Sequence, residues 1–436
     1  MPSSKPSHAP LFEPLPLPCG QTLKNRIAKA AMEESLAEPG QLPGASFQAL
    51  YRRWAEGGVG LLITGNVMVA RDALTGPGTL VLEHDTPLAP FEAWAAAAHA
   101  GGARIWMQIS HPGRQVLAAL GNPGYAPSAV ALQMGKHGKL FAPVRELTGQ
   151  QIEAVQQGFV ETARAAARAG FDGVQIHAAH GYLISQFLSP LTNRRTDRFG
   201  GGIEQRSRLL IEVVRAVKAA VPSGFAVAVK LNSADFQRGG FSEADAKAVV
   251  SLLNDEGIDL LELSGGSYES PAMQGRTADG RTLAREAYFL EFAQELARLA
   301  KMPLMTTGGV RRREIAERVL AGGVSLVGMA TALAFDPTLP KRWQHAESAV
   351  DPLVVDWKDK ALASLAGMAT VRRQLRRMGA GQEPATSLSP FGSLIVDQLR
   401  ARRLTRRYLG WHRLSRASSP LPAKPMEARG AELPQS

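Results

Sequence analysis

Residues 173–190 read Gly-Val-Gln-Ile-His-Ala-Ala-His-Gly-Tyr-Leu-Ile-Ser-Gln-Phe-Leu-Ser-Pro. The stretch begins with a short apolar run, Gly173–His177, which predicts a buried β-strand. His180 and Tyr182 follow at once, around a glycine that interrupts the strand pattern. In folds built on parallel strands, ligands and catalytic groups gather at the carboxyl ends of the strands. The stretch therefore predicts a strand of a parallel sheet with a functional site at its end.

Similar apolar runs recur through residues 25–335, and they alternate with longer stretches in which apolar residues lie three and four positions apart. This alternation is typical of repeated βα units around a parallel sheet. Eight units in one chain favour a closed barrel, so the predicted fold class is α/β, a single (β/α)8 TIM barrel with a C-terminal helical extension. The eight predicted strands are Arg26–Met32, Gly60–Thr64, Ala103–Gln108, Gly173–His177, Ala226–Leu231, Leu260–Leu263, Pro303–Thr306 and Ser325–Val327. The helical stretches include Glu153–Ala169, Ile203–Ala220, Glu243–Glu256 and Arg285–Leu299.

The βα rhythm stops after Pro340, so we expect a barrel of residues 1–340 and a basic extension of residues 341–436. The extension contains two helical patterns, Lys358–Met378 and Ser393–Tyr408, and a Pro- and Ala-rich end from Ser418 onward that is expected to be disordered. Of the formal net charge of +11, +9 belongs to residues 341–436. Such basicity usually marks a solvated helix face, here one that covers the barrel or contacts a second subunit of a homo-oligomer. A nucleic-acid-binding tail is the alternative.

The composition excludes several classes of protein. With 45% hydrophobic and 20% charged residues, it is that of a soluble globular chain. No apolar run approaches the length of a membrane span and no secretory signal is evident, so we expect a cytoplasmic protein without membrane contacts. Cys19 is the only cysteine, which excludes an intrachain disulfide, a cysteine-rich zinc site and a cysteine-ligated iron–sulfur cluster.

His177, His180 and Tyr182 form the strongest chemical signal in the sequence. Imidazole N–H groups can stabilise an oxygen that gains negative charge, and a phenol with an ordinary pKa of about 10 can protonate a carbanion. A structural interpretation, in which the histidines satisfy backbone groups and Tyr182 belongs to the core, stays open from these residues alone. No metal is expected, because a zinc site would need a third ligand with a recognisable motif.

The surroundings of these residues extend the pattern. The block His177–Pro190 is followed by Asn193-Arg-Arg-Thr-Asp-Arg-Phe-Gly-Gly201. Further blocks are Leu23-Lys-Asn-Arg-Ile27, Gln108-Ile-Ser-His-Pro-Gly-Arg114 and Thr306-Thr-Gly-Gly-Val310. In content and order these blocks resemble the Old Yellow Enzyme family of FMN-dependent reductases. The resemblance covers about residues 11–340, the whole predicted barrel.

The resemblance implies roles for individual residues. His177 and His180 would bind the electron-withdrawing group of a substrate, and Tyr182 would protonate the carbon α to that group. Gln108 would donate a hydrogen bond to the pyrimidine edge of the flavin. Lys230 occupies the place of a basic residue beside flavin N1 and C2=O, where a cation stabilises the negative charge of the reduced ring.

Backbone groups would complete the cofactor site. The resemblance assigns the face of the isoalloxazine to Ala30, Ala31 and Met32, and the FMN phosphate to Gly308, Gly309, Gly328 and Met329. Two positions depart from the family pattern. Glu33 stands where many members have Cys or Thr near flavin N5, and Met329 stands where Arg is commoner.

The expected activity is that of an FMN-dependent oxidoreductase that passes hydride from NADH or NADPH to an activated C=C bond, such as that of an enone or nitroalkene. No Gly-x-Gly-x-x-Gly follows a predicted strand, so the nicotinamide and the electrophilic alkene should use one pocket in turn. Flavin barrels of the dienoyl-CoA reductase or amine dehydrogenase type carry a cysteine-bound cluster that this chain cannot build. A flavin-dependent RNA-modifying or nucleic-acid-binding protein is the alternative from another class.

Overall fold

The computed structural model describes residues 10–270, 290–345 and 349–418. Eight parallel strands form its centre, and each pairs with the next until the last pairs with the first. These strands are β3 (Ile27–Lys29), β4 (Leu61–Ile63), β7 (Arg104–Ser110), β10 (Gly173–Ala178), β11 (Ala226–Asn232), β12 (Leu260–Ser264), β13 (Leu304–Thr307) and β14 (Leu326–Met329). Each overlaps one predicted strand, so the predicted (β/α)8 barrel is confirmed.

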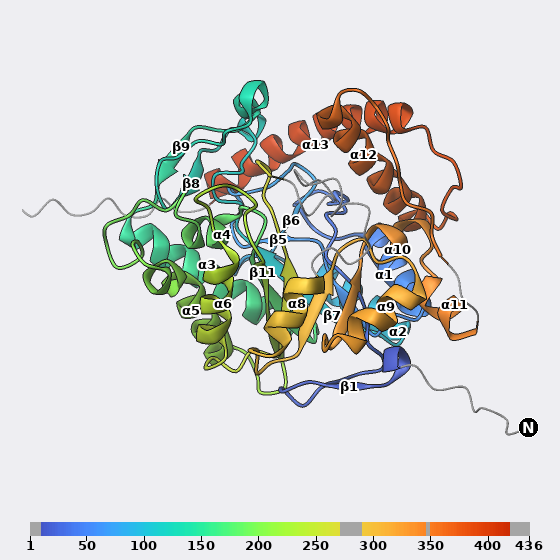
Figure 1. The fold of residues 1–436 in the computed structure, drawn as a ribbon. Coiled ribbons are helices and arrows are strands. Elements are labelled where there is room, and N and C mark those ends of the chain that lie inside the picture. The colour runs from blue at the N-terminus through green and yellow to red at the C-terminus, as the bar shows by residue number, and fades with distance from the viewer. Residues whose placement is uncertain (1–9, 271–289, 346–348, 419–436) are drawn as a thin grey trace, which may run out of the picture.

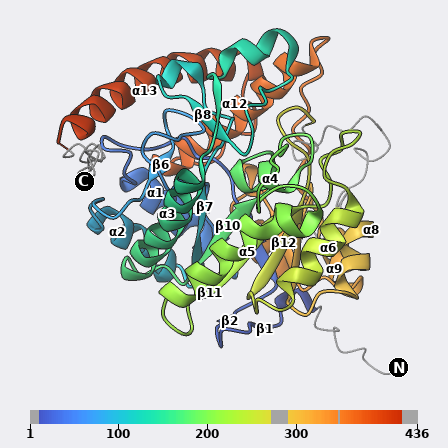
Figure 2. The same cartoon turned by 90° about the vertical axis from the view of Figure 1, so that its left-hand side faces the viewer.

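Helices surround the barrel, as Figures 1 and 2 show. They are α1 (Ala45–Glu56), α2 (Ala89–Ala100), α3 (Gly149–Arg168), α5 (Ile203–Ala220), α6 (Glu243–Leu253), α8 (Leu290–Ala297), α9 (Arg313–Ala321), α10 (Thr331–Phe335) and α11 (Leu339–His345). Helix α5 has the predicted bounds. Helix α3 begins earlier than predicted because Thr148 caps it in a capping box with Gln151. Residues 285–289 of the predicted Arg285–Leu299 helix lie outside the described residues.

Short strands close the amino-terminal end of the barrel. The antiparallel pair β1 (Leu15–Pro16) and β2 (Thr22–Leu23) lies at the lower end of the barrel in Figure 1. Leu15 and Leu23 belong to the same buried cluster as the barrel residues Ala226 and Leu260. Because this end is filled with apolar side chains, a polar ligand has to enter from the opposite, carboxyl end.

The loops at the carboxyl end contain elements too short to be predicted from periodicity. Strands β5 (Val67–Met68) and β6 (Leu80–Val81) extend the sheet beside the end of β7. The long loop predicted at 109–147 contains η2 (Ala118–Leu120), β8 (Gly124–Ala126), η3 (Gly135–Leu140) and β9 (Val144–Glu146). The loop after β10 contains α4 (Leu183–Leu188). The loops that surround the carboxyl end of the barrel therefore have regular structure of their own.

The extension folds into two helices that pack against each other, α12 (Lys360–Gly379) and α13 (Pro390–Ser418). Both overlap the predicted helical patterns, and residues 419–436, most of the predicted disordered end, lie outside the described residues. The two helices lie across the end of the barrel opposite β1 (Figure 1). Two arginines of α12, Arg372 and Arg376, both bind Asp397 of α13, at 2.6 and 3.1 Å. In the part of the chain that the structure describes, no helix is long and apolar enough to cross a membrane.

Tyr408 fastens the extension to the carboxyl-end loops. Its side chain is fully buried in a cluster that includes Leu74, Val81 and Leu120. Its hydroxyl accepts a hydrogen bond from Asn122 Nδ2 at 2.7 Å and donates one to the carbonyl of Arg71 at 3.0 Å. Helix α13 is thus held by both apolar and polar contacts.

Replacing Tyr408 with Ala is expected to lower the free energy of unfolding by about 3–5 kcal/mol, because a large buried ring is lost and a cavity remains. Tyr408→Phe keeps the ring but leaves the Asn122 amide and the Arg71 carbonyl unsatisfied, so its expected loss is about 1–3 kcal/mol. Chemical denaturation measures both. A Tyr408→Ala loss below about 0.5 kcal/mol, the size of an ordinary surface substitution, would show that the extension is not part of the packed fold.

Candidate functional site

The side chains that point into the barrel change from apolar to polar toward its carboxyl end. Inward positions of the lower layers are apolar, as at Ala228, Leu260 and Trp106. Because inward side chains recur at every second strand residue, the next inward position of four neighbouring strands forms one further layer. That layer consists of buried polar side chains: Gln108, Gln175, Lys230 and Glu262. We call this layer the polar floor, and we call the opening above it, at the carboxyl end of the barrel, the mouth.

Hydrogen bonds join this floor into a chain. Gln108 Nε2 donates to Gln175 Oε1 at 2.7 Å, and Gln175 Nε2 donates to Glu262 Oε2 at 2.8 Å. Glu262 Oε1 binds Lys230 Nζ at 2.8 Å and accepts from Thr307 Oγ1 at 2.7 Å. Two of these residues, Gln108 and Lys230, were predicted as site residues. Gln175 and Glu262 were missed, although a polar residue within an otherwise apolar strand was a usable signal.

The predicted histidines and tyrosine converge above this floor. His177 and Lys230 are direct partners in the register of β10 and β11. The His177 ring lies 5.0 Å from that of His180 and 4.8 Å from that of Tyr182, between centroids. His180 adopts a left-handed backbone conformation, φ +61°, and its N–H donates to Asn232 Oδ1 at 3.1 Å. The chain bend thus turns all three rings into one mouth.

Both imidazoles are neutral near physiological pH. Burial lowers the pKa of His177 and of His180 well below the ordinary value, and the positive charge of Lys230 lowers both further. The Ala179 N–H donates to His177 Nδ1 at 3.2 Å, so the proton of His177 resides on Nε2. His180 Nε2 lies 2.8 Å from Ser264 Oγ. His177 can therefore act as a hydrogen-bond donor without carrying charge.

Tyr182 is accompanied by a second phenol. Its hydroxyl lies 3.0 Å from that of Tyr268, which follows β12. Burial raises the pKa of Tyr182 well above its ordinary value, and the proximity of Tyr268 and of Glu33 adds to the effect. Tyr182 is therefore protonated in the resting protein.

Glu33, one of the departures from the family pattern, is turned toward the loop before β6. Its Oε1 accepts hydrogen bonds from Thr75 at 2.9 Å and Thr79 at 3.3 Å. Burial raises the pKa of the Glu33 carboxyl, while the charge of Arg372 on α12 opposes that rise. The positive charge of Arg372, on the extension, thus acts on a carboxyl group at the mouth of the barrel.

Backbone groups gather on the other side of the mouth. Ala30, Ala31 and Met32 follow β3, and the Ala30 N–H donates to the Met329 carbonyl at 2.8 Å. A Cβ on Gly328 would lie 2.2 Å from Thr307 Oγ1, so this position requires glycine. The Met329 side chain is buried in the core outside the barrel, which leaves its backbone as the group near the mouth.

Gly308 and Gly309 follow β13, and Gly309 has a φ of +70° that favours glycine. The donor set of the mouth comprises a buried ammonium, an amide and neutral imidazoles, facing glycine-rich backbone across the opening. A planar ring that becomes negative on reduction and carries a phosphate needs donors of these kinds. The residues present therefore fit FMN.

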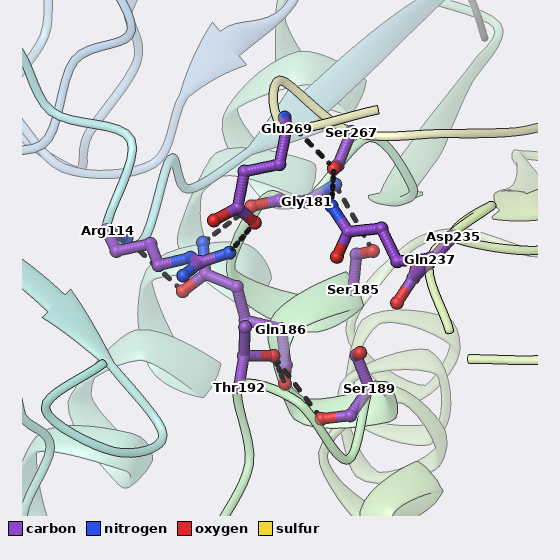
Figure 3. Close-up of a pocket in the computed structure, with 10 residues that line it drawn as sticks. All are labelled: Arg114, Gly181, Ser185, Gln186, Ser189, Thr192, Asp235, Gln237, Ser267 and Glu269. Atoms are coloured by element: carbon purple, nitrogen blue, oxygen red, sulfur yellow. Dashed lines mark hydrogen bonds and ion pairs between the residues drawn. The ribbon is translucent and has the colours of Figure 1, made fainter. Parts of the chain in front are cut away.

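A small polar cavity lies beside Gly181, the residue between His180 and Tyr182 in the sequence (Figure 3). It is lined by Arg114, Gly181, Ser185, Gln186, Ser189, Thr192, Asp235, Gln237, Ser267 and Glu269. Buried Arg114 forms an ion pair with Glu269 across it. This cavity belongs to the wall that supports the rings.

Comparison with known proteins agrees with this geometry. The family model for the NADH:flavin oxidoreductase / NADH oxidase family matches residues 10–349. The chain is 41% identical over 357 residues to the NADH-dependent flavin oxidoreductase iliE of Neonectria sp., covering 76% of this chain and 46% of that protein. The chain thus spans about half the length of this relative. It is 39% identical to the iliE protein of Hypocrea jecorina, covering 77% of this chain and 88% of that protein.

Solved structures show the same likeness. An Old Yellow Enzyme homologue from Zymomonas mobilis superposes with a TM-score of 0.67 at 27% identity, covering 78% of this chain and 94% of that one. Morphinone reductase in complex with tetrahydroNAD superposes with a TM-score of 0.66 at 27% identity, covering 78% and 93%. The matched family model covers the whole barrel together with the polar floor and the three rings. This chain therefore belongs to the NADH:flavin oxidoreductase family, the FMN-dependent oxidoreductases that include the Old Yellow Enzymes.

Proposed function

We propose that this protein reduces the activated C=C bond of an electrophilic alkene, such as an enone or a nitroalkene. The observation that carries the proposal is the convergence of His177, His180 and Tyr182 beside Lys230 at one mouth. FMN held at this mouth would supply the hydride chemistry, from NADH or NADPH to the β-carbon of the alkene. Everything else in the reaction is done by side chains of the chain.

His177 and His180 are proposed to bind the carbonyl or nitro oxygen of the alkene. As hydride reaches the β-carbon, negative charge moves onto that oxygen, and N–H donors already in place stabilise it. His177 Nε2 carries the required proton because Nδ1 is occupied by the Ala179 N–H. Tyr182 then gives its proton to the α-carbon, which completes the addition of H₂ across the double bond.

Lys230 and Gln108 are proposed to hold the pyrimidine edge of FMN, and Ala30, Ala31 and Met32 to line its ring. Gly308, Gly309, Gly328 and Met329 would receive the phosphate through backbone N–H groups. Glu262 and Gln175 support this arrangement because they fix the heads of Lys230 and Gln108. Part of the basicity of the extension serves the fold itself, since Arg372 and Arg376 share Asp397 and Arg407 donates to the Ala37 carbonyl.

The purified protein is expected to be yellow and to lose its visible absorbance when NADH or NADPH is added without oxygen. Addition of cyclohexenone or a nitroalkene should restore the absorbance and yield the saturated product. Anaerobic spectroscopy with product analysis measures both steps. A protein that binds FMN and oxidises NADH, but is reoxidised by no electron-poor alkene, would refute the proposed substrate class.

A further inference from the structure

Tyr268 is the second phenol of the site and lies beside the hydroxyl of Tyr182. Its hydroxyl lies 3.0 Å from that of Tyr182, and the two rings meet nearly edge-on at a centroid distance of 6.0 Å. Tyr182 is only 6% exposed, whereas Tyr268 is half-buried. The two phenols therefore form a hydrogen-bonded pair, and Tyr268 is the partner with the less enclosed side chain.

The proposed reaction needs a source of protons beside Tyr182. After Tyr182 has given its proton to the substrate it is a phenolate, which burial and the neighbouring Glu33 disfavour at this position. The phenolate must regain a proton before the next turnover, and its enclosure keeps bulk water away. Asn66 also contacts Tyr182 and stabilises a negative charge there, but an amide is too weak an acid to supply the proton.

We propose that Tyr268 is a second proton donor of this site, which returns a proton to Tyr182 after each reduction. The proposal rests on the function proposed above. In the step itself the O–H bond of Tyr268 breaks as an O–H bond forms on Tyr182, and no electrons leave either ring. Water then restores the proton of Tyr268, so the pair carries one proton inward for every alkene reduced.

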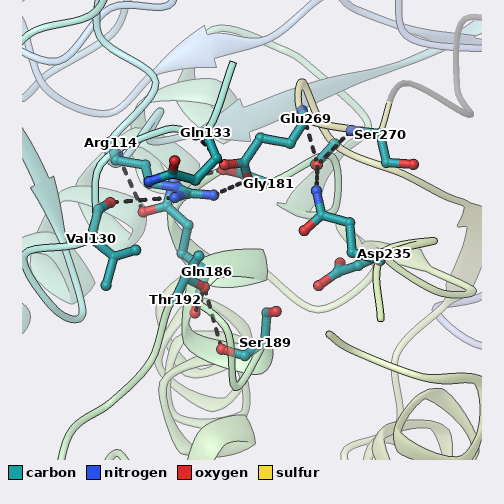
Figure 4. A network of polar contacts seen from close by, with 12 residues as sticks. Arg114, Val130, Gln133, Gly181, Gln186, Ser189, Thr192, Asp235, Glu269 and Ser270 are labelled. Carbon is teal, nitrogen blue, oxygen red and sulfur yellow. Dashed lines mark hydrogen bonds and ion pairs between the residues drawn. The ribbon is translucent and has the colours of Figure 1, made fainter. Parts of the chain in front are cut away.

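The loop that carries Tyr268 is fastened by its neighbour, Glu269. Glu269 forms an ion pair with Arg114, and its Oε1 accepts a hydrogen bond from the Gln133 N–H at 2.6 Å. Arg114 also donates to the carbonyls of Val130 and Ala131. Figure 4 shows the Arg114 side chain between Val130 and Glu269. Glu269 and Arg114 are thus positioning residues that tie the loop after β12 to the loop after β7.

The extension contributes charge to the same phenol. Burial and Glu33 raise the pKa of Tyr268, and the guanidinium of Arg372 on α12 opposes them. A nearby cation stabilises the transient anion that forms when Tyr268 passes its proton on. The Arg114–Glu269 ion pair that holds the loop and the positive charge of Arg372 therefore both favour proton transfer through Tyr268.

The test compares Tyr268→Phe with Tyr182→Phe and with the control Tyr125→Phe, which removes a phenol on β8. Two rates are measured for each holoenzyme: reduction by NADH, by rapid mixing, and multiple-turnover reduction of an enone in H₂O, D₂O and their mixtures. Tyr268→Phe is expected to slow multiple-turnover alkene reduction about 10- to 100-fold, the effect of losing a hydrogen bond to a charged group. Its reduction by NADH should stay within about twofold of the wild type, as should both rates of Tyr125→Phe.

The dependence on deuterium content distinguishes a relay from a structural role. In multiple turnover the wild type should show a curved dependence, because the protons of Tyr182 and Tyr268 move in two successive steps that both contribute to the rate, and Tyr268→Phe should show a linear one. Glu269→Gln should reduce the curvature while leaving NADH oxidation intact. A Tyr268→Phe enzyme with the wild-type rate and curvature would overturn the relay, and so would an equal loss in both half-reactions. If Tyr182→Phe is also as fast as the wild type, the proposed donor role itself fails, which separates the two claims.

Discussion

Replacing Tyr182 with Phe is expected to slow the reoxidation of the reduced enzyme by an enone about 10²- to 10⁴-fold, the usual contribution of a positioned general acid. The substitution removes one hydroxyl from a buried ring and leaves His177 and His180 in place. Reduction by NADH needs no proton from Tyr182, so its rate should change by less than about threefold. Anaerobic rapid mixing measures the two half-reactions separately.

The His177→Ala variant is the matched comparison for this prediction. It removes an N–H donor while keeping the proton donor, so it should weaken binding of the enone as well as slow its reduction. Equal losses in both half-reactions of Tyr182→Phe would contradict the donor role, because they would show a general disturbance of the site. An unchanged rate with the enone would contradict it directly.

Replacing Lys230 with Met is expected to have the second largest effect. Glu262 is fully buried and binds Lys230 Nζ at 2.8 Å, so the substitution leaves a buried carboxyl without its cation. Removing one partner of a buried ion pair typically lowers the free energy of unfolding by about 3–5 kcal/mol. If Lys230 also stabilises the negative charge of the reduced cofactor, as we propose, reduction by NADH should slow about 10- to 100-fold.

A double variant separates the structural effect of Lys230 from the catalytic one. Lys230→Met combined with Glu262→Gln removes both charges, so most of the lost stability should return. The rate of reduction by NADH should stay low, because the cation is still absent. Chemical denaturation and rapid mixing on the same samples provide the two readouts. Recovery of the rate together with the stability would show that Lys230 acts only through folding.

The barrel and the rings of its mouth could be predicted because their signals are local. A strand such as Gly173–Ala178 is mostly apolar and fully buried, and helix α5 shows its periodicity over its full span. The resemblance then supplied roles for His177, Lys230 and Gln108. The strand register brings these residues together: His177 and Lys230, far apart in the sequence, are neighbours because β10 and β11 pair in parallel.

The remaining features depend on contacts that no local pattern encodes. Glu262 is a charged residue in a buried strand, and only its ion pair with Lys230 on the neighbouring strand explains it. Lys29 presents the same difficulty: its ammonium is buried against Tyr51 and the carbonyl of Ile63, and burial lowers its pKa to about 8. The strands β5 and β6 are two residues each, below the length at which periodicity can be measured. The Tyr182–Tyr268 pair arises from loop conformations that follow from tertiary packing.

The contacts of Tyr408 also bear on how the protein is synthesised. Its hydroxyl bonds residues 286 and 337 positions earlier in the chain, so both contacts must wait until almost all of the described polypeptide has left the ribosome. The last barrel strand, β14, ends at Met329, well before this residue. Domains fold during translation as their residues emerge. The barrel can therefore close before α13 binds the loops at its carboxyl end, so docking of the extension is among the last events of biogenesis.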